Sequence, residues 1–305
     1  MSINYPLGIV LALFYTTHMK NNISQHYRLL NLLHSFLLLA GMFSLLGLTG
    51  WLVAGFIGLF WALGACVILL VVIPGSSSHL ILYLYGARPF SPERLTKIID
   101  WLANQSHLSY TPKLYYIPRR TLIAFSVGLK KDRAIAISDG MIRALTIREL
   151  AAVLAHEMSH IQSKDLWVMA LANVINYITS LMALSGYIMI LFYLPLLIYQ
   201  QQSIPWLLLL ILILAPGLSA LMQLALSRTR EFNADSQSVK LTGDPQGLIS
   251  ALKKMQRYES WLKHLLLPGL HIPESSLLRS HPVTEERIRR LQEIAQQDTH
   301  LFNVE

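Results

Sequence analysis

The sequence predicts a mainly helical fold with a small β-sheet and four transmembrane helices. Hydrophobic residues make up 53% of the 305 residues and charged residues only 14%, which is too apolar for an ordinary soluble domain. Lys, Arg, Asp and Glu are absent from residues 29–87 and from residues 166–227. One crossing of a bilayer takes about 20 residues, so each uncharged stretch is long enough to cross twice. Soluble core helices are excluded, because helices of this length would need a charged face toward solvent.

Each uncharged stretch contains residues that favour a turn. Gly47-Leu48-Thr49-Gly50 lies in the first stretch, and Gln200-Gln201-Gln202-Ser203, followed by Pro205, lies in the second. We therefore expect one transmembrane hairpin within 29–75 and another within 166–227. The apolar run 166–199 exceeds the length of a single crossing, so its helix either starts above the membrane surface or ends at Pro195 beyond the far face.

The two hairpins place the charged parts of the chain on one side of the membrane. These parts are a tail (1–28) and two pieces of one domain (76–165 and 228–305), and they hold all 25 Lys and Arg and all 17 acidic residues. By the positive-inside rule this side is the cytoplasm. The net charge of +8 favours contact with the anionic headgroups of the lipid bilayer. Nucleic acid is not an expected partner, because no basic run with interleaved aromatic residues occurs.

The amino-terminal tail is expected to contain no membrane crossing. Pro6 to Tyr15 is apolar but too short to span a bilayer, and neither a preceding basic residue nor a following cleavage site indicates a signal peptide. Met19 offers an alternative start, so residues 1–18 are either not part of the natural chain or form an interfacial helix. The single cysteine, Cys66, excludes an internal disulfide and is expected to be a small core residue of the second crossing.

Short β-rich runs occupy the region between the hairpins. They cover residues 114–117, 123–125 and 134–137, and the charged segments 118–120 and 130–132 separate them. We expect a small sheet whose edge can receive an extended peptide by strand addition. Ala134 to Ser138 is the candidate for that edge, and the alternative is a purely structural strand.

A helix carrying two histidines on one face follows the predicted sheet. Thr146 and Glu149 have the spacing of a capping box, and an apolar stripe continues from there. His156-Glu157-Met158-Ser159-His160 therefore lies within a helix, where residues four apart share a face. Two imidazoles so placed can bind one tetrahedral Zn²⁺, and Glu157 can then take a proton from water at the open position. The alternative is a chance match on a polar helix face.

The predicted zinc site needs a third ligand, which the segment Glu231-Phe232-Asn233-Ala234-Asp235 can supply. It belongs to a stretch, 221–239, that is predicted to be helical. Glu231 would complete a set of three ligands for one zinc ion per chain, and Asp235 would accept the second ring N–H of His156. The alternative is an ordinary solvated acidic face. Because Arg228 and Arg230 mark the end of the fourth crossing, the metal is expected about one or two helical turns from the lipid.

Taken in order, these motifs resemble the HtpX-type membrane zinc metallopeptidases, relatives of the CAAX prenyl endopeptidases. The resemblance covers about 29–292 and implies a zincin-like (gluzincin) catalytic domain split by the second hairpin, with zinc on His156, His160 and Glu231 and with Glu157 as the catalytic base. It further implies that His281 donates to the oxyanion of the transition state and that Arg287 supports that site. The segments that carry the resemblance, besides the two above, are Tyr85-Gly86-Ala87-Arg88-Pro89, Asp165 after the histidine motif, Arg230, Ser280-His281-Pro282 and Glu286-Arg287.

The resemblance also implies a function. It predicts a zinc endopeptidase in a bacterial inner membrane, with its catalytic domain in the cytoplasm, that degrades misfolded or unassembled membrane proteins as part of a stress response. Two alternatives are a prenyl-type processing protease and a catalytically silent scaffold that keeps zinc for structure. This chain has Ile123-Ala124-Phe125 where relatives usually show Asn-Ala-Phe, so it lacks an amide that can clamp substrate backbone.

Overall fold

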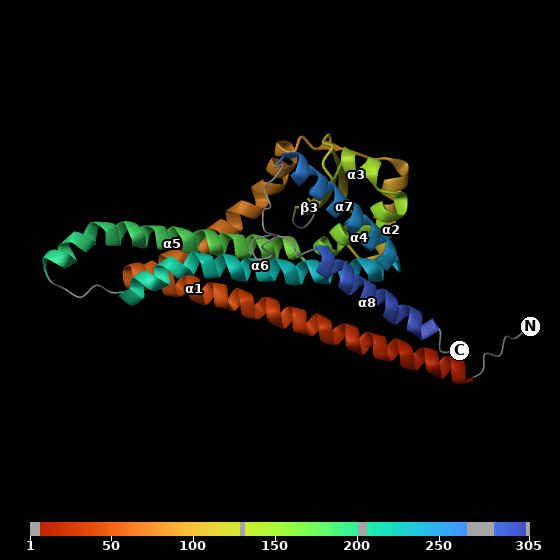
Figure 1. The fold of residues 1–305 in the computed structure, drawn as a ribbon, viewed down its shortest axis with the longest axis horizontal. Coiled ribbons are helices and arrows are strands. Elements are labelled where there is room, and N and C mark those ends of the chain that lie inside the picture. The colour runs from red at the N-terminus through yellow and green to blue at the C-terminus, as the bar shows by residue number, and fades with distance from the viewer. Residues whose placement is uncertain (1–6, 129–131, 201–205, 267–283, 303–305) are drawn as a thin grey trace, which may run out of the picture.

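The computed structural model describes residues 7–128, 132–200, 206–266 and 284–302. Three long helices, α1 (Leu7–Leu84), α5 (Asp165–Tyr199) and α6 (Trp206–Thr242), pack lengthwise against one another, and a smaller domain lies beside one end of them (Figure 1). Within the described residues, three helical segments are long and apolar enough to cross a membrane: Asn31–Val71, Asp165–Leu196 and Trp206–Thr242.

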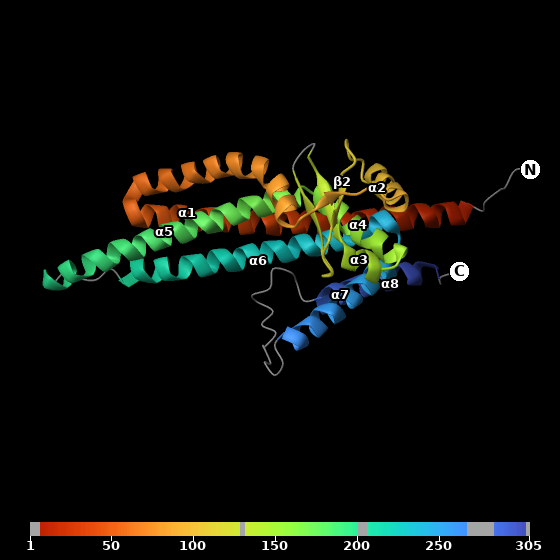
Figure 2. The same ribbon diagram turned by 90° about the horizontal axis from the view of Figure 1, so that it is seen from above.

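Helix α1 reverses direction and so forms two arms that lie side by side (Figure 2). The reversal is at Ala54 and Gly55, where Gly55 has φ +59° and open space around the position of a Cβ. The turn predicted at Gly47 to Gly50 is therefore wrong, because those residues are helical. Gly50 instead lies against the returning arm, where a Cβ on Gly58 would be 2.0 Å from the Gly50 carbonyl oxygen. The glycines predicted to form the turn allow close packing next to it.

The second hairpin consists of α5 and α6. Helix α5 continues through Pro195 to Tyr199, so Pro195 does not end it, and the predicted turn at 200–205 falls largely on residues outside the described ones. Pro216 of α6 has no N–H for the carbonyl of Leu212, one turn before it. The hydroxyl of Tyr187 on α5 donates to that carbonyl over 2.6 Å. This bond satisfies a backbone group that lipid could not, and it joins the two helices.

Four strands form the small sheet, and three of them coincide with the predicted runs. They are β1 (Arg88–Pro89), β2 (Lys113–Ile117), β3 (Ala124–Val127) and β4 (Ala134–Ser138), in the order β1-β2-β4-β3. Strand β4 is parallel to β2 and antiparallel to β3. All five residues of β4 are buried, so the expectation that Ala134 to Ser138 forms an edge is wrong. A strand without an alternating polar face is typical of the middle of a sheet, and the edge strands are β1 and β3.

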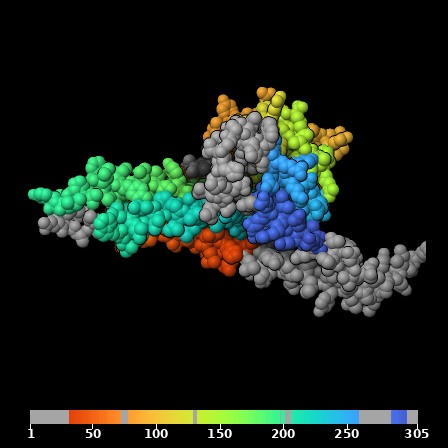
Figure 3. All heavy atoms as spheres, viewed as in Figure 1, coloured from red at the N-terminus to blue at the C-terminus, as the bar shows by residue number. Residues whose placement is uncertain are grey.

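Helix α4 (Ile147–Gln162) forms the centre of the smaller domain. Leu154 and Met158 pack in one buried cluster with Leu102 and with Ile135 and Ile137 of β4. The other helices of the domain are α2 (Glu93–Gln105), α3 (Asp139–Ala144), α7 (Pro245–Leu266) and α8 (Thr284–Phe302). Helices α7 and α8 pack against each other on one face of the domain (Figure 3).

The first turn of α4 is fixed to α7 by a buried glutamate. Both hydrogen bonds of the predicted capping box between Thr146 and Glu149 are present. Glu149 also accepts hydrogen bonds from Ser250 and, over 2.7 Å, from Lys254 of α7. Burial alone would raise the pKa of Glu149, but these hydrogen bonds outweigh it and lower the pKa to about 2. The carboxylate therefore stabilises the start of the helix that carries both motif histidines.

Candidate metal centre

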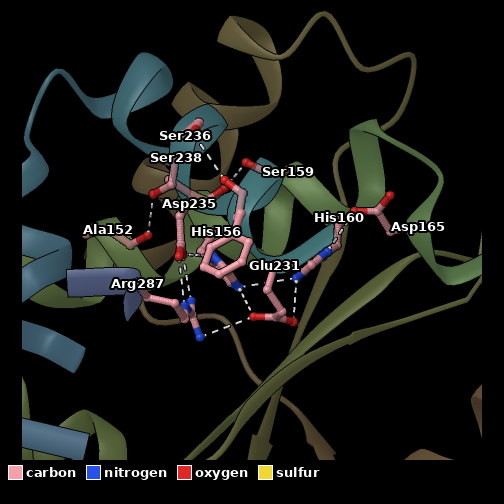
Figure 4. Close-up of polar contacts among 12 residues, drawn as sticks. Ala152, His156, Ser159, His160, Asp165, Glu231, Asp235, Ser236, Ser238 and Arg287 are labelled. Carbon is pink, nitrogen blue, oxygen red and sulfur yellow. Dashed lines mark hydrogen bonds and ion pairs between the residues drawn. The ribbon is translucent and has the colours of Figure 1, made fainter. Parts of the chain in front are cut away.

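Three side chains from two helices meet at one point (Figure 4). Helix α4 supplies His156 and His160, whose Nε2 atoms are 3.2 Å apart. Helix α6 supplies Glu231, of which Oε2 lies 3.5 Å from Nε2 of His156 and Oε1 lies 3.6 Å from Nε2 of His160. Ligand atoms at about 2.0–2.1 Å from a tetrahedral Zn²⁺ are about 3.3–3.4 Å from each other. The two histidine nitrogens thus have about the spacing that one such ion requires, and each lies close to one of the two oxygens of Glu231.

His156 is held from behind by a buried carboxylate. Its Nδ1 atom lies 3.0 Å from Oδ1 of Asp235, which is the predicted contact, although the ring N–H is not aimed straight at that oxygen. Asp235 is in turn bound by Arg287 of α8 through two hydrogen bonds of 2.6 and 2.7 Å. A third nitrogen of Arg287 lies 3.1 Å from Glu231. Arg287, predicted beside the oxyanion, is thus found on the two carboxylates of α6.

His160 also contacts a buried aspartate, Asp165, for which the sequence predicted no role. Its Nδ1 atom lies 2.9 Å from Oδ2 of Asp165, and the other oxygen of Asp165 accepts a 2.9 Å hydrogen bond from Arg230. Asp165 is 2% exposed and Arg230 is 9% exposed. One signal was available: Asp165 is the last charged residue before an uncharged membrane stretch, and a charge in such a place needs a partner.

The charges around the donors favour a cation. Four buried carboxylates, from Glu157, Glu231, Asp235 and Asp165, face two buried guanidinium groups, from Arg287 and Arg230. With neutral histidines the cluster has a formal charge of −2, which one divalent ion neutralises. In the metal-free protein the surplus of negative charge favours the protonated form of His156. Burial alone would lower the pKa of His156, but the carboxylates of Asp235 and Glu231 outweigh burial and raise the pKa to about 10. The donor set and the charge therefore both fit a bound Zn²⁺.

Of the remaining predicted catalytic residues, the structure describes Glu157 and Arg287. Glu157 lies between the two histidines on α4 and is 8% exposed. Burial alone would lower the pKa of Arg287, but the nearby carboxylates, of Asp235, Glu231 and Glu157, raise it. His281 lies outside the described residues.

A helix with the pattern His-Glu-x-x-His, completed by a glutamate from a second helix, defines the class of HExxH metallopeptidases. A family model described as Peptidase family M48 matches residues 89–295. The chain belongs to this family and is a metalloprotease, as the motifs predicted. Its membrane helices make it an integral membrane protein.

Relatives of known name agree with this assignment. The chain is 35% identical over 283 residues to "Protease HtpX homolog" of Acaryochloris marina (strain MBIC 11017), covering 86% of this chain and 92% of the relative. It is 32% identical over 282 residues to "Protease HtpX" of Legionella pneumophila (strain Lens), covering 86% of this chain and 99% of the relative. A solved structure, that of S. mikatae Ste24p, is similar with a TM-score of 0.48 and 20% identity, covering 76% of this chain and 57% of that one.

Proposed function

We propose that this chain is a zinc endopeptidase in which His156, His160 and Glu231 bind one Zn²⁺ and Glu157 is the general base. The observation that carries the proposal is the convergence of three possible ligand atoms, one from each residue, within 4.8 Å of one another. The two Nε2 atoms, 3.2 Å apart, have about the separation of two ligands on a tetrahedral zinc ion. The neighbouring charges support it, because a divalent cation balances the buried carboxylates.

The side chains of this site have distinct tasks in peptide hydrolysis. When bound, Zn²⁺ supplies Lewis-acid chemistry that favours deprotonation of water and stabilises the developing negative charge on the substrate carbonyl. Glu157 takes the proton of the attacking water and returns it to the leaving amine, which is the role of a general base and then of a general acid. The carboxylate of Asp235, 3.0 Å from Nδ1 of His156, favours the tautomer that keeps the proton on Nδ1, so that Nε2 keeps its lone pair for the metal. Arg287 holds Asp235 and Glu231 in place.

Of the two edge strands of the sheet, β3 is the one on which we expect an extended substrate to add. In the described part of the chain, β3 is hydrogen-bonded to β4 on one side only, and it packs against α4, the helix of the histidines. Strand addition there would bring a peptide bond alongside the site. Ile123 precedes β3, and its backbone N–H and C=O both bond to Ser138. Its aliphatic side chain has no amide group that could bind the substrate.

The proposal extends to the membrane and to the substrates. The two arms of α1 together with α5 and α6 would make four crossings, with both pieces of the domain in the cytoplasm of a bacterial inner membrane, as the distribution of Lys and Arg supports. Glu231 lies on the same helix as the last crossing, so the site is near the lipid surface. That position suits misfolded or unassembled membrane proteins as substrates. No observation on the described residues favours a prenyl-processing enzyme or a silent scaffold instead.

Zinc content and proteolysis, measured on the full chain in detergent, test the proposal. Glu157→Gln should keep one zinc ion yet lose cleavage of an unfolded casein-like substrate, because glutamine cannot accept the proton. Glu231→Ala should lose zinc, because two ligands hold the ion poorly. Glu93→Gln, at a carboxylate 82% exposed on α2, is the control and should change neither property. Wild-type zinc affinity in Glu231→Ala, or full activity in Glu157→Gln, would overturn the assignment.

A further inference from the structure

The two histidines of the metal centre are supported by two parallel sets of side chains. Behind His156 stand Asp235 and Arg287, and behind His160 stand Asp165 and Arg230. In each set the aspartate contacts Nδ1 of the histidine with one oxygen, at 3.0 Å and 2.9 Å, while an arginine binds the carboxylate. The spacing of the motifs predicts the contact between Asp235 and His156, but it predicts no role for Asp165 or Arg230.

The second set lies where the membrane hairpin meets the catalytic domain. Asp165 is the first residue of α5, and Arg230 lies on α6 directly before Glu231. The chain reaches Asp165 through Lys164, whose φ of 57° is in the left-handed region that side chains other than glycine rarely adopt. This turn brings the first residue of a membrane helix beneath the last histidine of α4. The ion pair then joins α5 to α6 next to the metal donors.

We propose that Asp165 is the positioning residue of His160, and that Arg230 fixes Asp165, so that the membrane hairpin itself holds half of the metal site. This inference rests on the zinc role proposed above. An ionised carboxylate can only accept hydrogen bonds, so Nδ1 of His160 carries the proton and Nε2 presents its lone pair. Because Arg230 binds the other oxygen over 2.9 Å, the carboxylate cannot turn away from the ring.

A purely structural ion pair between α5 and α6 is the competing explanation. It predicts that loss of Asp165 lowers thermal stability but leaves the zinc affinity of the folded protein unchanged. A positioning role predicts weaker zinc binding and a changed ligand geometry in protein that is still folded. The two explanations therefore differ in binding and spectroscopic measurements, and stability alone does not separate them.

The test uses the full chain in detergent, stripped of metal, at a temperature where each variant is folded by circular dichroism. Zinc Kd is measured by competition with a chelator, and the visible absorption of the Co²⁺-substituted protein reports ligand geometry. Asp165→Asn should raise Kd by about 10- to 100-fold and alter the Co²⁺ bands. Arg230→Gln keeps the carboxylate of Asp165 but removes the arginine that holds it, and should give a smaller change of the same kind. This variant replaces Asp165→Asn in the test if Asp165→Asn does not fold.

Glu149→Gln is the control, because it removes another buried carboxylate that is paired with a cation, Lys254, two turns before His156 on α4. It should lower stability without changing Kd or the Co²⁺ bands. If Asp165→Asn and Arg230→Gln behave like this control, Asp165 is structural and the inference is wrong. Failure of the zinc role itself looks different: the wild type would then bind no stoichiometric zinc, or Glu231→Ala would bind it as tightly as the wild type.

Discussion

Replacing Arg287 with methionine removes the guanidinium group that joins two carboxylates of α6 while keeping much of the apolar stem. Arg287 is 8% exposed and makes contacts of 2.6 and 2.7 Å to Asp235 and 3.1 Å to Glu231. Removing one partner of a buried ion pair costs about 3–5 kcal/mol, because the other charge stays buried without compensation. Three contacts at short distance place Arg287→Met within that range. At about 2–4 °C per kcal/mol, the thermal midpoint should fall by roughly 6–20 °C.

The measurement is thermal unfolding of the detergent-purified protein, together with its zinc content after gel filtration. Arg287→Met should unfold earlier and retain less zinc, because Asp235 and Glu231 lose the group that orients them. Arg289→Met, two residues along α8, is the control: its side chain is 70% exposed and lies 3.9 Å from Glu293, so little change is expected. Suppose instead that Arg287→Met kept its midpoint and its zinc but lost kcat. The guanidinium would then act on the substrate, and the positioning role derived from its contacts would be refuted.

Three further predictions concern stability, topology and catalysis. Glu149 has a pKa lowered to about 2 from 4.5, so its charge contributes about 3 kcal/mol at most above pH 4.5, and the contribution is lost as the pH falls toward 2. The gap in thermal midpoint between wild type and Glu149→Gln should therefore close over that range, and a gap independent of pH would contradict the assignment. Cysteine labelling at Asn104 should report the cytoplasm and at Gln201 the opposite side, whereas cytoplasmic labelling at Gln201 would rule out the second hairpin. His281→Ala should lower kcat by about 10²- to 10³-fold with little change in KM or zinc content, and loss of zinc would make the residue structural.

Features that depend on neighbours along the chain could be predicted from the sequence. The absence of charge over two long stretches indicated the membrane helices, because a bilayer selects apolar residues by number alone. The capping box at Thr146 and the spacing of His156 and His160 placed two donors on one helix face, because helical geometry is local. Glu231 and Asp235 followed from the same rule on a second helix, once the first motif required a third donor.

The predictions made from the sequence were wrong where several residues or segments could form the same feature. The sequence offered several glycines for the reversal of α1, and only the fold shows that Gly55 takes the positive φ while Gly50 and Gly58 allow the arms to approach. It gave three β-rich runs but not their order, because hydrogen bonds between strands depend on packing across the whole domain. Strand β4 lies inside the sheet, between β2 and β3, and β3 is one of the two edge strands.

By itself, the sequence determined the class of the protein: local charge, helical spacing and an ordered set of motifs identified a membrane metallopeptidase and the donors of the proposed metal site. Only the tertiary structure decided how those donors are held. Arg287 reaches Asp235 across 52 residues of chain, and Arg230 reaches Asp165 across 65. No sequence pattern specifies such pairs, because an arginine binds whichever buried carboxylate the folding of distant helices brings within hydrogen-bonding distance.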